Sequence, residues 1–208
     1  MRPYHLIGSI MDLTGSLIAF AISLLAYKAF KVTGYRIFLY FFLGFGLLGV
    51  GSLGRSTIIL SLTFLPLRGR PPIPLLMWVN SIVNLLKLTA YLSIAIGYTL
   101  QAKRAYLTAH ELILSLFLLR FSNPFIEALN TFITLYLVFH SLVVFLENKL
   151  PSSFGIFTGF GLMWASHFLT LLCLMRALPL RYLSLAEVIY WASFVPFLSV
   201  LIAVVRAK

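Results

Sequence analysis

The 208-residue chain is 61% hydrophobic and only 10% charged. A soluble domain carries about 25% charged residues, so these charges are too few to cover a water-exposed surface. Several apolar runs are also longer than the roughly 20 residues that a helix needs to cross the hydrocarbon core, and they lack the alternation of membrane β-strands. The sequence therefore predicts an all-α, polytopic transmembrane helix bundle, and it excludes a soluble enzyme module.

The net charge of +11 points to lipid and not to nucleic acid. Basic pairs such as Lys103 with Arg104, or Arg68 with Arg70, lie in short loops between the apolar runs. No basic domain lies outside these runs, so no nucleic-acid partner is expected. The expected partners are the bilayer and its anionic lipid head groups. The sequence leaves open whether the chain also joins a homo-oligomer or a larger membrane complex.

Seven apolar segments divide the chain and make residues 1–208 a single transmembrane domain. The expected spans are about 7–30, 35–60, 74–100, 105–120, 124–147, 153–176 and 185–206. The basic, proline-rich segment 66–74 is the clearest break, because proline cannot continue a helix. The segment 105–120 is short and contains His110 and Glu111, so the count falls to six spans if this segment lies on the membrane surface.

The third span carries a polar stripe with the spacing i, i+4, i+7 and i+11, which places its members on one helix face. The members are Asn80, Asn84, Lys87 and Tyr91. A lysine near the bilayer centre costs about 2.5 to 3.5 kcal/mol on insertion scales, so Lys87 is expected to face the bundle interior. The stripe predicts a pocket that binds an anionic group or takes part in proton transfer. The alternative is a structural ion pair, with the asparagines bonded to neighbouring helices.

None of the acidic residues is expected at the depth of Lys87. At 1.5 Å of rise per residue, Asp12, Glu127 and Glu187 lie nearer the side of the membrane that holds the N-terminus. Asp12 comes within reach only if the lysine side chain extends toward that side. The lack of an obvious partner favours ligand binding. Arg55, on the same side, is expected to pair with Asp12 or Glu127 in a structural role.

Intramembrane histidines offer a second kind of site, because haem iron takes axial histidine ligands. His110 and His140 have similar expected depths and would suit a haem b. His140 and His167 differ in depth by roughly 10 Å, so they are not expected to share a ligand. The alternative is that these histidines are buried and hydrogen-bonded within the bundle. The single cysteine, Cys173, reads as a small buried hydrophobe, and no metal site is predicted.

Two short matches indicate an internal repeat. The tetrapeptide Gly-Phe-Gly-Leu occurs at 44–47 and again at 159–162, and Trp78 has a counterpart in Trp191. Spans one to three would then match spans five to seven, with 105–120 as the connector. This 3+1+3 layout is a parallel repeat of the kind found in transporters.

Glycine and proline patterns give two packing predictions. Gly155 and Gly159 have the GxxxG spacing that lets two helices approach closely. Pro196 should kink the last span. The distribution of basic residues, eight against seven, favours the side of the C-terminus as cytoplasmic.

Three functional hypotheses follow. The first is a small-solute or ion transporter, or a ligand-sensing membrane protein, built around the polar stripe. The second is a membrane subunit of a larger, for instance respiratory, complex, with or without haem b at His110 and His140. The third is an intramembrane enzyme acting on lipids, but the chain contains no Walker A, HExxH or GxSxG motif. No catalytic residue is therefore assigned.

Overall fold

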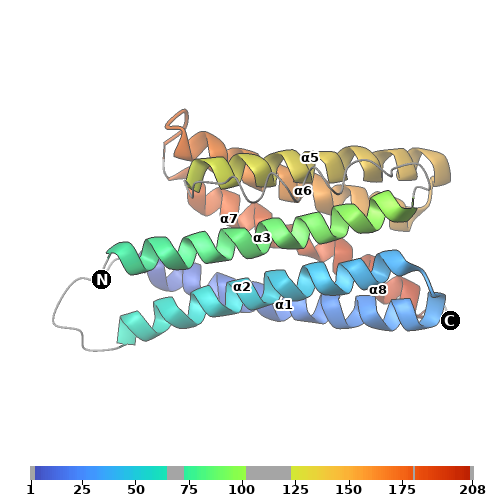
Figure 1. Cartoon of the computed structure of the whole chain (residues 1–208), viewed down its shortest axis with the longest axis horizontal. Coiled ribbons are helices and arrows are strands. Elements are labelled where there is room, and N and C mark those ends of the chain that lie inside the picture. Colours follow the sequence, from blue (N-terminus) through green and yellow to red (C-terminus); the bar gives the residue numbers. More distant parts are fainter. Residues whose placement is uncertain (1–2, 65–72, 102–122, 180, 207–208) are drawn as a thin grey trace.

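The computed structural model describes residues 3–64, 73–101, 123–179 and 181–206, and these segments are helical almost throughout (Figure 1). The helices are α1 (Pro3–Thr33), α2 (Arg36–Phe64), α3 (Ile73–Gln101), α5 (Asn123–Asn148), α6 (Pro151–Leu174), α7 (Tyr182–Ala192) and α8 (Phe194–Arg206). Six stretches in this part of the chain are long and apolar enough to cross a membrane, with α7 and α8 together forming one of them. The protein is therefore a multi-pass helical membrane protein.

The six observed spans agree with six of the expected ones to within a few residues. The expected fourth span, 105–120, lies outside the described residues, so the count of seven and the six-span alternative both stay predictions. The assignment of one face as cytoplasmic also stays a prediction.

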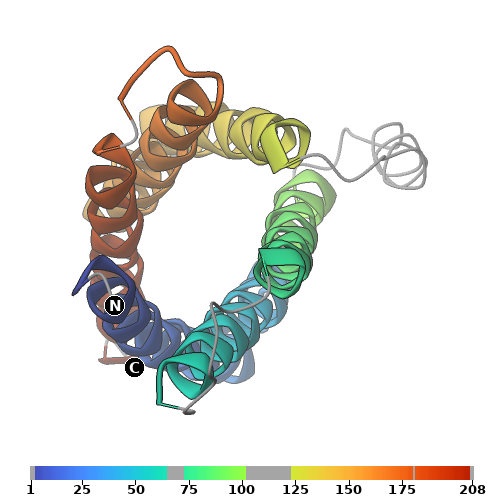
Figure 2. The same ribbon diagram turned by 90° about the vertical axis from the view of Figure 1, so that its left-hand side faces the viewer.

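The helices form a closed ring, which Figure 2 shows end-on. Neighbours in sequence pack side by side, and contacts of α3 with α5 and of α1 with α8 complete the ring. Helices α3 and α5 run in the same direction: Asn84 and Glu127 line one cavity, and farther along both helices Thr99 Oγ1 lies 2.8 Å from the Tyr136 hydroxyl. The end of α3 and the start of α5 therefore lie at opposite ends of the bundle (Figure 1).

Local sequence explains the turns between neighbouring helices. Gly34 ends α1 with a φ of 74°, a left-handed conformation that glycine adopts without steric penalty. Pro151 opens α6 in its first turn, where a missing N–H does no harm. The last span is divided at Ser193, between α7 and α8, three residues before Pro196, and the kink expected at Pro196 stays a prediction. Proline cannot donate the helical hydrogen bond to the carbonyl four residues earlier, which loosens this turn.

An aromatic cluster fills the half of the bundle nearer the C-terminus. Its members, all buried, are Phe41, Phe45, Tyr98, Phe160, Phe194 and Phe197. Their rings meet mostly edge to face, and the centroids of Phe160 and Phe197 are 4.8 Å apart. A Cβ added at Gly159 would lie 2.6 Å from the Phe197 ring, so the absence of a side chain there lets α6 approach α8.

The two halves of the expected repeat are not alike in detail. Trp78 is 66% exposed on the outside of α3, whereas Trp191 packs against Gly15 and lines an internal cavity. The 3+1+3 repeat stays a prediction.

Candidate functional site

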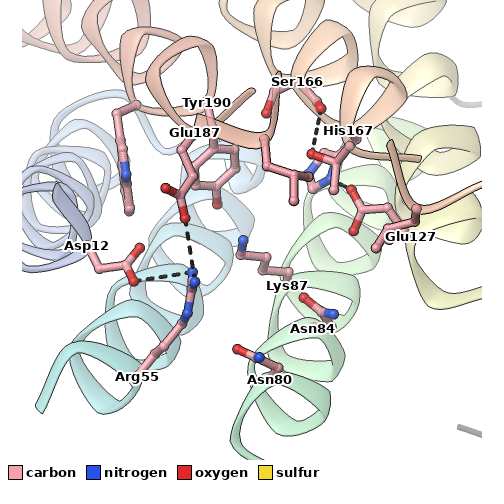
Figure 3. Close-up of a pocket in the computed structure, with 14 residues that line it drawn as sticks. Asp12, Arg55, Asn80, Asn84, Lys87, Glu127, Ser166, His167, Glu187 and Tyr190 are labelled. Carbon is pink, nitrogen blue, oxygen red and sulfur yellow. Dashed lines mark hydrogen bonds and ion pairs between the residues drawn. The ribbon is translucent and has the colours of Figure 1, made fainter. Parts of the chain in front are cut away.

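A cavity of about 240 Å³ lies inside the ring, in the half nearer the N-terminus. All six spans contribute to its wall, and Figure 3 shows its side chains. The polar and charged members are Asp12, Arg55, Asn80, Asn84, Lys87, Glu127, Ser166, Thr170, His167, Glu187 and Tyr190. Five of the ten charged side chains in the described spans line this one cavity, which marks it as the candidate site.

The polar stripe of α3 forms one wall of this cavity. Asn80, Asn84 and Lys87 all line it, as the helical spacing predicts. The Lys87 amine extends into the middle of the group (Figure 3) and lies 4.6 Å from the centroid of the Tyr190 ring. The face of the Tyr190 ring carries partial negative charge, so this contact favours the charged ammonium form of Lys87 over the neutral amine. Ligand binding by these residues stays a prediction.

No carboxylate in the described part of the chain lies within 4.0 Å of the Lys87 Nζ atom. Three carboxylates nevertheless line the same cavity, those of Asp12, Glu127 and Glu187. The sequence predicted that these carboxylates lie at a different depth from Lys87, because the prediction used the rise per residue and so compared Cα positions alone. The lysine side chain extends toward them, which brings its amine into their cavity.

Arg55 bridges the two acidic residues on the opposite wall. Its guanidinium lies 3.2 Å from a carboxylate oxygen of Asp12 and 3.4 Å from one of Glu187. The expected pairing with Asp12 is confirmed. The second partner is Glu187, on α7, instead of Glu127.

Glu127 is bonded to a histidine. Its Oε1 atom lies 2.6 Å from Nδ1 of His167, and both side chains are buried. The other ring nitrogen, Nε2, lies 2.7 Å from the hydroxyl of Tyr91. That hydroxyl lies 3.4 Å from the hydroxyl of Tyr190, so four side chains from α5, α6, α3 and α7 form one hydrogen-bonded chain.

Tyr91 differs from the rest of the predicted stripe, because it does not line the cavity. It is fully buried behind His167 and Tyr190. It lies four positions beyond Lys87 on α3, and this further turn of helix takes it past the residues that line the cavity. Its hydroxyl bonds to His167 and does not line the cavity, and a part for Tyr91 in ligand binding stays a prediction.

The histidines occupy separate surroundings. His140 packs between the rings of Tyr98 and Tyr136, whose centroids lie 5.0 Å and 6.0 Å away. His167 contacts Tyr91, two helical turns from Tyr98, which agrees with the expected difference in depth of roughly 10 Å. His110, the other half of the predicted haem b site, lies outside the described residues, so that prediction is untested.

Sequence reasoning missed the pairing of Glu127 with His167. A signal was available, since an acidic residue and a histidine on adjacent antiparallel spans each need a buried partner. Glu127 lies near the start of one span and His167 near the end of the next, so the two are level across the hairpin.

The fold and the site together define a multi-pass membrane protein with a charged cavity enclosed by its spans. Comparisons with protein-family models, curated proteins and solved structures find no match to this chain.

Proposed function

We propose that the protein binds a small anionic solute at Lys87 and carries it across the membrane. The observation that carries the proposal is the Lys87 ammonium, which extends into the cavity with no carboxylate of the described chain within 4.0 Å. A cation inside a membrane protein is expensive to bury, and an anionic ligand would compensate it.

The partners of the other charged groups support an anion as the ligand. Arg55 engages the carboxylates of Asp12 and Glu187, and His167 engages that of Glu127. Lys87 is thus the charged group of the cavity that is left to meet a solute. The amides of Asn80 and Asn84 line the same wall and would supply N–H donors to its oxygen atoms.

The size and position of the cavity support a small transported molecule. Its volume of about 240 Å³ is just below the roughly 300 to 1,000 Å³ of typical small-molecule pockets. Lys87 lies near the middle of the span Trp78–Leu100, and carriers bind their solutes near the midplane of the membrane. The aromatic cluster separates the cavity from the opposite face, as in a carrier that is open to one side.

A matched pair of lysine variants tests the proposal. Lys87→Met removes the proposed anion ligand, and Lys31→Met removes an exposed lysine at the far end of α1. Isothermal titration with acetate, lactate, phosphate and chloride should show binding of at least one anion to the wild type. Lys87→Met should weaken that binding at least about tenfold, the value of a charge-assisted hydrogen bond, whereas Lys31→Met should not.

Stability separates ligand binding from a structural role. If Lys87 were half of a buried ion pair, Lys87→Met would destabilise the protein by about 3 to 5 kcal/mol. We expect a change of less than about 1 kcal/mol in denaturant unfolding. Absence of anion binding to the wild type, or equal binding by both variants, would refute the proposal. Binding without uptake of the anion into proteoliposomes would point to a sensor instead of a carrier.

A further inference from the structure

The chain of hydrogen bonds behind the cavity has a feature that anion binding alone does not require. Glu127 and His167 form a buried acid–imidazole pair in the cavity wall, with Oε1 and Nδ1 2.6 Å apart. Burying two ionisable groups is unfavourable unless both are engaged, and a hydrophobic pair would close the wall at less cost. His167 is also bonded on its second nitrogen, so neither of its ring nitrogens is idle.

We infer that the Glu127–His167 pair is a proton-binding site, coupled to the anion at Lys87. This inference rests on the proposed function and adds a second ligand, the proton, to the same cavity. A proton and a monovalent anion would then enter together and leave the charge of the cavity unchanged.

The charges around the Glu127–His167 pair support the binding of one proton for each monovalent anion. The charged and titratable groups that surround the pair come from four other helices, and they are Asp12, Arg55, Lys87, Tyr91, Glu187 and Tyr190. With a neutral imidazole, three carboxylates outnumber two cations by one. An anion at Lys87 adds a second excess negative charge to a poorly solvated space. One proton on the pair offsets it, which favours binding of both ligands together.

The hydrogen-bonded chain can accept that proton without moving a helix. In the neutral form, the Nδ1–H group of His167 donates to the Glu127 carboxylate, and the Tyr91 hydroxyl donates to Nε2. In the protonated form, the added proton lies on Nε2 and is donated to the Tyr91 oxygen. The Tyr91 hydroxyl then turns its hydrogen to the Tyr190 oxygen, 3.4 Å away. Tyr190 lines the cavity, so the proton would pass between solvent and Nε2 by transfer along the Tyr190 and Tyr91 hydroxyls.

Tyr190 links the two proposed ligand sites. Its hydroxyl receives the hydrogen bond from Tyr91, and the face of its ring lies beneath the Lys87 amine at 4.6 Å. The imidazole of His167 also packs edge-on against this ring. Lys87 and the pair are therefore close enough for the charge on one to change proton binding at the other by about tenfold, taking an effective dielectric constant of about 20.

The test uses ¹⁵N NMR of histidine-labelled protein in detergent, with no anion ligand added. The chain has four histidines, and His167→Gln identifies the signals of His167. In the wild type, these signals should change with pH as the pair takes up one proton. Lys87→Met imitates neutralisation of the ammonium by an anion, so it should raise the midpoint of this titration by about one pH unit. Lys31→Met should leave it unchanged.

Two further variants keep the test decisive. Glu127→Gln should lower the midpoint, because the imidazolium loses its carboxylate, and Lys87→Gln replaces Lys87→Met if the latter does not fold. Signals of His167 that stay constant over the whole range would overturn the inference, as would equal midpoints for the Lys87 and Lys31 variants. Because no anion is present, these results are separate from the calorimetry that tests the proposed function.

Discussion

The two halves of the bundle are built largely by the same helices, but charged and polar side chains line the inside of one half and aromatic rings fill the other. In the half nearer the N-terminus, α2, α6 and α7 supply Arg55, His167 and Glu187 to the cavity. A few turns along the same elements and into α8, the side chains on the inside of the ring belong to the aromatic cluster. One end is held by ion pairs and hydrogen bonds, and the other by close ring packing.

This difference explains how one bundle can hold charges inside a membrane. Ionisable groups are tolerated there when they face one another or water. The rings of the aromatic cluster pack against one another in the opposite half of the bundle. A solute at Lys87 would therefore reach water from one face of the membrane, and the cluster would have to open for release to the other.

The largest expected effect is a difference in labelling between the two ends. In a Cys173→Ser background, which removes the native cysteine, Asn80→Cys places a thiol in the cavity wall. Ala95→Cys places one in the packed half of α3. A membrane-impermeant thiol reagent should modify Asn80→Cys from one face of sealed vesicles only, because charged walls admit water. It should modify Ala95→Cys from neither face.

Labelling of Ala95→Cys as fast as Asn80→Cys would show that the aromatic end is as open as the polar one. Labelling of Asn80→Cys from both faces would show that the cavity crosses the whole bundle. Either result would remove the contrast between the two halves.

The next effect concerns packing at the aromatic end. Phe197→Ala removes a buried ring that contacts Phe41, Phe45 and Phe160. Large-to-small changes of this kind destabilise by about 3 to 5 kcal/mol. Phe132→Ala is the matched control, since Phe132 is 69% exposed on the outside of α5, and its loss should change stability by about 0.5 kcal/mol or less. Unfolding in a mixed-detergent titration measures both, and equal losses would mean that the cluster adds little.

The spans could be predicted from the sequence because hydropathy and length are local properties. Helix α3 was expected over 74–100 and runs Ile73–Gln101, and α6 was expected over 153–176 and runs Pro151–Leu174. The closure of the ring by α3 with α5 and by α1 with α8 could not be predicted, because it joins helices that are far apart in the chain. Only the packing of whole faces decides such pairs.

Part of the site was also predictable from local properties of the sequence. The spacing of Asn80, Asn84 and Lys87 fixes a common helix face, and the energetic penalty of a lysine in lipid fixes where that face points. That the carboxylates of Asp12, Glu127 and Glu187 share a cavity with Lys87 was not predictable from Cα depth alone. Long side chains reach a turn or more along the axis, so residues at different depths meet in one cavity.

The smallest effect tests whether ion pairs hold the polar end as ring packing holds the other. Arg55→Met leaves the buried Asp12 and the 34% exposed Glu187 side chain without their shared cation. Breaking a fully buried pair costs about 3 to 5 kcal/mol, but exposed pairs contribute about 1 kcal/mol or less. Since the Arg55 side chain is 25% exposed, we expect an intermediate loss of about 2 kcal/mol.

Two control variants show whether the stability loss in Arg55→Met comes from its ion pairs. Arg36→Met removes an exposed arginine from the other end of the same helix and should change stability by about 0.5 kcal/mol or less. In the double variant Arg55→Met/Asp12→Asn the buried carboxylate is neutral, so part of the lost stability should return. If the double variant is as unstable as the sum of its single changes, Arg55 and Asp12 act independently. The polar end would then be stabilised by something other than its ion pairs, most directly by the hydrogen bonds around His167.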